Sequence, residues 1–268
     1  MCYQFNIYAQ PLKLMTYNIR LDVKSDGENS WANRKDFFNA QIQFYEPDVF
    51  GVQEALPNQV NDIANFLTQY AYVGIGRDDN NTGESSNIFF KKNKFIVKQS
   101  NTFWLSPTPS KVSKGWDAAL NRICTYVLLK DKHSNKQFWV FNTHLDHMGE
   151  IARTKSLELI IATIDALNIN NYPVIFMGDF NSEPYTERIK QLKTKMNDTR
   201  LVSIQKPFGP EGTFNNFKHN EPISHLIDYI FISKNFNCIV NKYAVLTDAI
   251  NLKYPSDHCP VYVDVIFK

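Results

Sequence analysis

The sequence predicts an α/β fold in which two stacked β-sheets are covered by helices. Short apolar runs that are typical of strands recur along the whole chain of 268 residues. Helical patterns fall between groups of these runs and do not follow every strand, which favours stacked sheets over a uniform α/β barrel. Apolar residues make up 43% of the chain and the composition shifts nowhere, so we expect one large core and one domain.

The first half of the chain is expected to alternate between strands and amphipathic helices. Ser30 is a favourable N-cap for the first helix, and Pro47 precedes the second strand. Polar turns separate three further apolar runs, which indicates a β-meander. The predicted segments are strands at 12–19 and 47–54, helices at 31–46 and 57–70, and the meander at 70–76, 85–92 and 95–105.

The second half is expected to contain a hairpin, a long helix and several core strands. The hairpin turns at the polar stretch "HSNK", and the long helix places its apolar residues on one face. Ser182 is predicted to cap a further helix with Pro184 in its first turn. The predicted segments are strands at 123–132, 137–146, 172–181, 226–232, 238–246 and 261–267, and a helix near 149–167.

Composition limits the classes of function. The 29 basic and 27 acidic residues disfavour a strongly cationic nucleic-acid-binding protein, although a local basic patch stays compatible. The four cysteines lack a C-x-x-C spacing and do not predict zinc, and no apolar run predicts a membrane span. Residues 1–11 are expected to be an N-terminal extension or the remnant of an export signal trimmed near Ala9, and residues 12–268 the domain. The compartment stays open.

Polar residues interrupt the apolar strands near their ends. Because residues i and i+2 of a strand point to the same face, Asp179 and Asn181 should lie together, as should Asn142, His144 and Asp146. Buried carboxylates are costly unless they are paired or bind a cation. The polar residues at six strand ends are Asn18, Glu54, His144, Asp179, Asn181, Asp228, Asp257 and His258.

Each of these residues has an ordinary structural explanation when it is taken alone. Glu54 can end a strand, Asp228 can cap a turn, and His144 can be a core histidine with satisfied hydrogen bonds. Together, however, the carboxylates and amides offer hard oxygen ligands, which suit Mg²⁺ or Mn²⁺ and not zinc. His144 and His258 would add proton transfer or phosphate contacts near neutral pH. The set therefore predicts a divalent-cation site with adjacent histidines.

The motifs "TYN", "QE", "NTHL", "GDFN", "IDYIF" and "SDH" occur in an order and near a spacing that resembles the endonuclease/exonuclease/phosphatase superfamily. The resemblance spans residues 12–267, and "QE", "GDFN" and "SDH" in sequence carry most of its specificity. The stretches "YNIRLD", "SWANRK", "NRICTYV" and "THLDHMGEIAR" look closest to a bacterial branch related to deadenylase and nocturnin-like enzymes. The branch that repairs abasic sites in DNA usually has a tyrosine in place of His144.

The resemblance implies a four-layer α/β sandwich, with two central mixed sheets flanked by helices, that hydrolyses phosphoester bonds. It also implies a Mg²⁺ or Mn²⁺ cofactor and direct attack of water on phosphorus. Asp179 would orient or deprotonate that water, and Asp228 would orient His258. The implied metal ligands are Glu54, Asn18 and Asp257, and the implied catalytic residues are Asp179, Asn181, His144, His258 and Asp228.

The sequence specifies the substrate less closely. Several side chains near the expected cleft could contact substrate, and each could equally serve packing or an ion pair. The segment 104–122 is long, polar and aromatic, so we expect it to form a rim that selects substrate. The candidate substrate-binding residues are Arg20, Arg34, Arg122, Asn142, His147 and Trp116.

Three functions compete at this point. The favoured one is a Mg²⁺-dependent phosphodiesterase or phosphatase for a small or medium phosphoester, because the charge is nearly balanced. The second is a nuclease or deadenylase that acts on single-stranded nucleic acid. The third is an inactive binding module on the same fold. No protein partner is predicted.

Overall fold

The computed structural model describes residues 11–267, and its architecture is built on two six-stranded mixed sheets. The strands of each sheet are given in spatial order. The first sheet contains β13 (Cys238–Val245), β14 (Val261–Phe267), β1 (Leu12–Asn18), β2 (Val49–Gln53), β6 (Ile88–Lys91) and β3 (Tyr70–Val73). The second contains β11 (Met196–Asp198), β12 (Asp228–Ser233), β10 (Val174–Asp179), β9 (Gln137–His144), β8 (Ile123–Asp131) and β7 (Phe95–Trp104).

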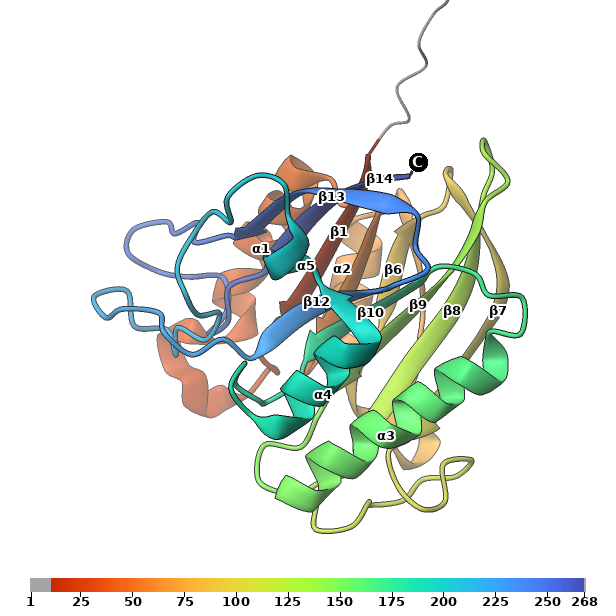
Figure 1. Ribbon diagram of the computed structural model, residues 1–268. Helices are drawn as coiled ribbons and strands as arrows, with labels where there is room; N and C mark the ends of the chain where they lie inside the picture. Colours follow the sequence, from red (N-terminus) through yellow and green to blue (C-terminus); the bar gives the residue numbers. More distant parts are fainter. Residues whose placement is uncertain (1–10, 268) are drawn as a thin grey trace, which may run out of the picture.

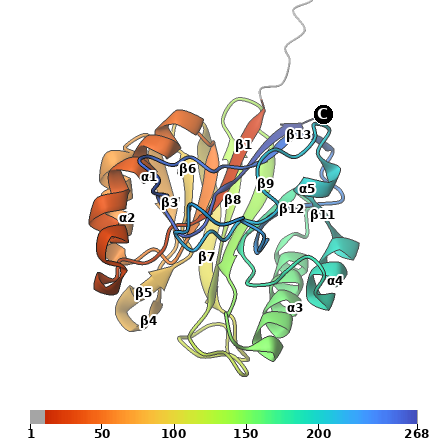
Figure 2. The same ribbon diagram turned by 90° about the vertical axis from the view of Figure 1, so that its left-hand side faces the viewer.

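Helices cover the outer face of each sheet, which gives four layers (Figures 1 and 2). In Figure 2 the helices α1 (Trp31–Tyr45) and α2 (Pro57–Phe66) lie beside the first sheet. The helices α3 (Glu150–Leu167) and α4 (Glu187–Lys195) lie beside the second. A short helix, α5 (Thr199–Val202), and a small ribbon of β4 (Gly76–Asp78) and β5 (Thr82–Ser85) complete the regular structure. The expected four-layer sandwich is confirmed.

Burial on both faces explains why the strands read as nearly continuous apolar runs. In β1, Leu12 and Leu14 point into the core between the sheets, whereas Met15 and Tyr17 pack in the cluster under α1 and α2. A third apolar cluster, which includes Leu157 and Ile160 of α3, lies against the other face of the second sheet. The sandwich therefore has one core between its sheets and one under each helical layer.

Two predicted details are wrong. The three runs from 70 to 105 do not form a meander, because β3 pairs with β6 in the first sheet whereas β7 pairs with β8 in the second. The chain changes sheets at the turn between β6 and β7, which apolar periodicity does not reveal.

The second wrong detail is the helix predicted to start at Ser182. The helix α4 begins later, after Thr186 as its N-cap. The hydroxyl of Ser182 accepts a hydrogen bond from Arg188, and its carbonyl accepts one from the Tyr229 hydroxyl of β12. These contacts hold Ser182 against the second sheet outside any helix.

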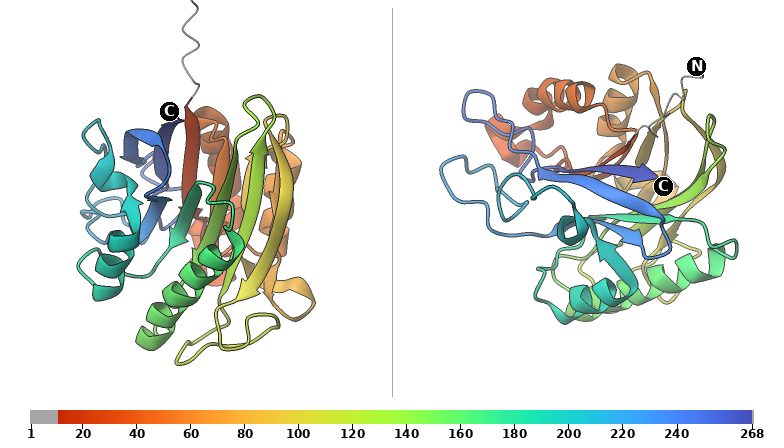
Figure 3. Two further views of the ribbon diagram at one scale, coloured as in Figure 1. Left: turned by 45° about the vertical axis from the view of Figure 1, so that its right-hand side comes forward. Right: turned by 45° about the horizontal axis from the view of Figure 1, so that its top comes forward.

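The parallel strand pairs determine where a site can form. The strands β1 and β2 run parallel, as do β9 and β10, and all four end at the same end of the sandwich. Figure 3 shows this end opposite to the one where β1 begins and β14 finishes. No helix within residues 11–267 is long and apolar enough to cross a membrane. The predicted extension, residues 1–11, lies outside the described part of the chain except for Pro11.

Candidate active site

Strand register places three predicted site residues side by side at the end of the second sheet. The last residue of β10, Asp179, is opposite His144 of β9 on one side and Asp228 of β12 on the other. Gly178 permits this close pairing, because its φ is +145° and a Cβ atom there would lie 2.0 Å from the carbonyl oxygen of Thr143. The glycine before Asp179 is therefore required by the neighbouring strand.

The first sheet brings its own polar residues to the same place. Asn18 ends β1 opposite Gln53 of β2, so Glu54 follows directly. The carboxylate of Glu54 accepts hydrogen bonds from Asn18 Nδ2 (3.0 Å) and the backbone N–H of Leu21 (3.0 Å). Asn18 Nδ2 also donates to Asp179 Oδ2 across the two sheets (3.0 Å). The strand ends of both sheets thus form one polar cluster.

His258, Asp228 and Asp179 form a buried row in this cluster. The ring Nδ1 of His258 is 2.8 Å from Asp228 Oδ2, which also accepts the Thr213 hydroxyl (2.6 Å). The other ring nitrogen, Nε2, lies 3.9 Å from Asp179 Oδ2. Burial lowers the pKa of His258, but the hydrogen-bonded Asp228 carboxylate, with the charges of Asp179 and Asp257, raises it to about 10. His258 is therefore an imidazolium at neutral pH.

His144 has the opposite charge state. Its Nε2 lies 3.0 Å from Asn181 Nδ2, which also donates to the Leu145 carbonyl (2.9 Å). This amide orientation makes Nε2 the acceptor and assigns the ring proton to Nδ1. Burial and the positive charge of Arg122 hold the pKa of His144 well below its usual range. The cluster therefore combines one charged and one neutral imidazole.

Left-handed backbone conformations occur at three of the predicted residues in or beside the polar cluster. Glu54 has φ +63°, Asn181 has φ +43° and Arg20 has φ +56°. Such values are uncommon for residues other than glycine and tend to occur where function requires a particular side-chain direction. In this conformation the backbone N–H of Asn181 donates a hydrogen bond to Asp179 Oδ1 (2.8 Å), which fixes that carboxylate.

The donor set fits a hard divalent cation. Four acidic side chains share the cluster, and the cations that act on Asp257 are His258, Arg20 and Arg34. Burial and the nearby Glu54 raise the pKa of Asp257, and burial and Asp228 raise that of Asp179. Within residues 11–267 the buried Oδ1 atom of Asp228 has no hydrogen-bond partner. A bound cation would relieve this excess of buried negative charge. The four acidic residues are Glu54, Asp179, Asp228 and Asp257.

A second grouping could also hold a metal. One ligand atom each from Asp179, Asp228 and His258 lies within 4.8 Å of the others. The hydrogen bond between His258 Nδ1 and Asp228 Oδ2 (2.8 Å) already explains why these side chains lie close together. The carboxylates and amide around Glu54 are therefore the better match to the chemistry of Mg²⁺.

The structure separates the predicted substrate contacts into two groups. Arg122 lines a small void beside His144, and the exposed His147 contacts Arg122 through Nδ1 (2.9 Å). Arg20 lies at the edge of the cluster, where Asp26 holds its guanidinium with two hydrogen bonds (2.8 and 2.9 Å). Trp116 is half-buried in the segment 104–122.

Arg34 and Asn142 serve the interior of the protein. The buried guanidinium of Arg34 donates to four backbone carbonyls, including those of Ile19 and Pro255. The fully buried amide of Asn142 bonds Gln53 and two backbone carbonyls of the opposite sheet. The polar atoms of both side chains form hydrogen bonds inside the protein, which corrects the expectation that these residues bind substrate.

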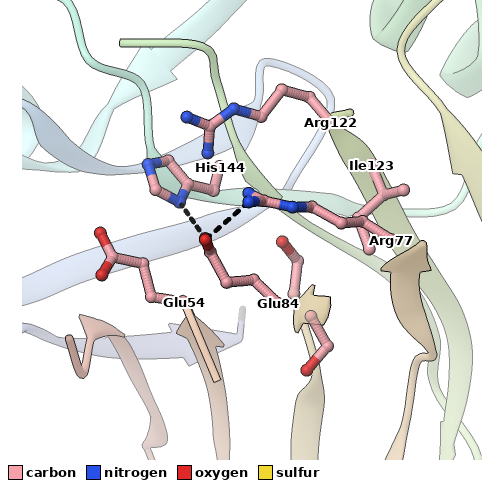
Figure 4. Close-up of a pocket in the computed structure, with 8 residues that line it drawn as sticks. Glu54, Arg77, Glu84, Arg122, Ile123 and His144 are labelled. Atoms are coloured by element: carbon pink, nitrogen blue, oxygen red, sulfur yellow. Dashed lines mark ion pairs between the residues drawn. The ribbon is translucent and has the colours of Figure 1, made fainter. Parts of the chain in front are cut away.

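Two charged residues of the site were missed from the sequence. Arg77 and Glu84 come from the β4–β5 ribbon, and Figure 4 shows them beside His144. Arg77 Nη2 is 2.7 Å from Glu84 Oε1, and Glu84 Oε2 is 3.9 Å from His144 Nδ1. The surrounding stretch "GRDDNNTGES" has the composition of an exposed turn, so its residue types carry no signal of a buried pair.

Known proteins resemble this chain in sequence and in fold. A profile of the Endonuclease/Exonuclease/phosphatase family matches residues 15–258. A mannosyl-6-phosphatase from Bacteroides thetaiotaomicron is 35% identical with a TM-score of 0.90, covering 96% of this chain and 100% of that chain. A family protein from Bacteroides vulgatus is 34% identical with a TM-score of 0.91, covering 97% and 100%.

A more distant relative is nocturnin from Mus musculus. It is 24% identical over 96% of this chain, which spans 66% of the length of that protein. The similarity therefore extends from bacterial proteins to the nocturnin group, as the motifs indicated. Because the profile covers nearly all of the sandwich and both sets of strand ends, the chain belongs to the endonuclease/exonuclease/phosphatase family and is a hydrolase of phosphoester bonds.

Proposed function

We propose that the chain is a Mg²⁺-dependent phosphatase of small phosphate monoesters, with sugar phosphates as the favoured class. The observation that carries the proposal is the environment of Asp179, whose Oδ2 lies 3.5 Å from His144 Nε2 and 3.9 Å from His258 Nε2. The similarity to a mannosyl-6-phosphatase supports the substrate class. The nearly balanced charge supports a small substrate over a polyanion.

Asp179 is the residue that would aim the attacking water. Its carboxylate is fixed by the N–H of Asn181 on one oxygen and by Asn18 Nδ2 on the other. A carboxylate held in this way can accept a proton from water and direct its oxygen toward phosphorus. Its raised pKa makes it a stronger base than an exposed aspartate once it is ionised.

The two histidines would stabilise the charge that develops during the reaction. In-line attack places negative charge on the phosphoryl oxygens and on the leaving oxygen. His258, held as an imidazolium by Asp228, would donate from Nε2 to a phosphoryl oxygen. The neutral His144 would donate from Nδ1 to an oxygen of the phosphate or of the leaving group.

Residues of the first sheet would hold the cofactor. Glu54, Asp257 and the side-chain oxygen of Asn18 are the ligands we assign to Mg²⁺, which when bound supplies positive charge to the phosphate. A covalent cysteine route is disfavoured, because burial raises the pKa of Cys259 to about 12 and removes the thiolate.

A substrate panel tests the proposal. Phosphate release from mannose 6-phosphate and glucose 6-phosphate is measured beside hydrolysis of bis-p-nitrophenyl phosphate and of an end-labelled oligoadenylate, each with Mg²⁺ and with EDTA. We expect the highest kcat/KM for the sugar phosphates in the presence of Mg²⁺. With EDTA we expect no turnover of any substrate. Preferred, salt-sensitive cleavage of the oligoadenylate would support the nuclease alternative instead. Absence of turnover on every substrate would overturn the assignment.

A further inference from the structure

A small void beside His144 is lined by polar atoms that lack partners. It measures about 10 Å³, which is room for roughly one water-sized atom. Within residues 11–267, no hydrogen-bond partner is present for Arg122 Nη1, Arg77 Nε or His144 Nδ1. These side chains are only 4%, 8% and 8% exposed. Figure 4 shows them converging with Glu54 and Glu84. Buried donors without acceptors indicate a position that a ligand oxygen completes.

The two arginines that line the void, Arg77 and Arg122, differ in their partners. Arg77 Nη2 is paired with Glu84 Oε1 at 2.7 Å, and both residues line the void. The partners of Arg122 are not among the residues that line the void: Nε is 3.3 Å from Asp146 Oδ2, and Nη2 is 2.9 Å from His147 Nδ1. The remaining donor group of Arg122, Nη1–H₂, has no hydrogen-bond partner among the described residues. The orientation of Arg122 thus depends on Asp146 and His147.

Asp146 is fixed by four backbone N–H groups. Its Oδ1 accepts from Gly149 (2.7 Å), Met148 (3.0 Å) and Ala119 (3.1 Å), and its Oδ2 accepts from Leu120 (3.3 Å). The carboxylate is 1% exposed, and its donors come from both the segment 104–122 and the loop after β9. One buried charge therefore connects the predicted rim, the loop that follows His144 and the guanidinium of Arg122.

A purely structural role for Asp146 would explain its backbone contacts. It would not explain why a buried arginine is held beside the polar cluster with one amino group unpaired, which costs desolvation energy. A phosphoryl oxygen in the void would satisfy that group, and a guanidinium suits such an oxygen well.

We propose that Arg122 Nη1 binds a phosphoryl oxygen of the substrate and that Asp146 is the positioning residue that holds Arg122 for this contact. The inference rests on the phosphoester hydrolysis proposed above and adds the subsite that receives the phosphate. The ligand of the subsite is an anionic phosphate oxygen, for which inorganic phosphate is the simplest probe.

Binding of inorganic phosphate in the presence of Mg²⁺ tests the inference without turnover. Calorimetric titration of Asp146→Asn and Arg122→Gln should show a Kd at least about tenfold above that of the unsubstituted protein, the loss expected for one charged hydrogen bond. The double variant should bind no more weakly than Arg122→Gln alone, because Asp146 acts through Arg122. In assays with substrate, KM and the inhibition constant of phosphate should rise together.

Asp117→Asn is the matched control. Asp117 is exposed and fastens the same segment to α3 by accepting from the N–H groups of Ile151 (3.2 Å) and Ala152 (2.6 Å). This substitution should lower the melting temperature and leave the Kd of phosphate within about twofold. If Asp146→Asn lowers stability in the same way without changing that Kd, Asp146 is a structural residue and the inference fails.

Two further outcomes are decisive. If Asp146→Asn does not fold, Asp146→Glu retains the charge but displaces it, and it should still raise the Kd of phosphate. An unchanged Kd in Asp146→Glu and Arg122→Gln would overturn the inference. Phosphate binding that depends on Arg122 in a protein that hydrolyses none of the tested esters would support the subsite and reject the proposed function.

Discussion

Asn142 allows a direct test of how the candidate site is supported. The sequence pattern predicts this residue beside His144 as a substrate contact, whereas the structure buries it completely between the sheets. Its Nδ2 donates to the carbonyls of Val52 and Asn87, each at 2.9 Å, and its Oδ1 accepts from Gln53 Nε2 at 2.7 Å. We predict that Asn142→Ala destabilises the protein and leaves the KM of the folded fraction unchanged.

The magnitude follows from the partners that the substitution leaves behind. Gln53 Nε2 keeps its bond to Thr16, and the Asn87 carbonyl keeps the N–H of Val52. The Val52 carbonyl and the second Nε2 hydrogen of Gln53 lose their contact with the Asn142 amide. Each buried polar group without its partner costs about 1–3 kcal/mol, so for these two groups the free energy of unfolding should fall by about 2–6 kcal/mol.

Urea denaturation followed by fluorescence measures this change, with KM determined in parallel at a temperature where the variant is folded. The exposed turn residue Asn93 supplies the control, since Asn93→Ala should alter the free energy of unfolding by less than about 0.5 kcal/mol. A variant at Asn142 with unchanged stability and a raised KM would refute the structural assignment and return the residue to the substrate site.

Three further predictions concern the polar cluster and the neighbouring Asp146. Asp228→Asn should lower kcat by about 10²–10⁴ with little change in KM, because the imidazolium of His258 loses its partner; a kcat within tenfold of the unsubstituted value would count against the pair. Glu54→Gln should raise the Mg²⁺ concentration required for half-maximal rate by at least about tenfold, and an unchanged requirement would remove Glu54 from the ligand set. Burial opposes ionisation of Asp146, but the N–H groups of Gly149, Ala119 and Met148 hold its pKa well below the usual range. Its stabilising contribution is thus present above the unfolded pKa of about 3.9 and lost as the pH falls below it, so the stability deficit of Asp146→Asn in urea should shrink between pH 7 and pH 3.

Much of the fold could be predicted because most strands are buried on both faces and read as continuous apolar runs. The polar residues that end those strands then stand out, which is why the sequence alone singles out Asp179, His144 and Glu54. Periodicity does not state which sheet a strand joins, so the placement of β7 was predicted wrongly. Pairing between distant segments decides such assignments.

The remaining errors arise from polar side chains used inside the protein. Arg34 and Asn142 have the residue types of substrate contacts, but they satisfy backbone carbonyls and a buried amide. Arg77 and Glu84 have the residue types of an exposed turn, yet the ribbon carries them to the void beside His144. Residue type and local spacing do not distinguish a polar side chain that supports the fold from one that lines the site. Only the contacts in the folded structure distinguish them.

The most direct test of the central claim compares Mg²⁺-dependent phosphate release by the unsubstituted protein and by Asp179→Asn. Both are assayed on the best substrate of the panel, with circular dichroism to verify that the variant is folded. We predict turnover by the unsubstituted protein that EDTA abolishes, and a rate at least about 10³-fold lower for the variant, because the buried carboxylate that aims the water is gone. Turnover by Asp179→Asn at the unsubstituted rate would contradict the account.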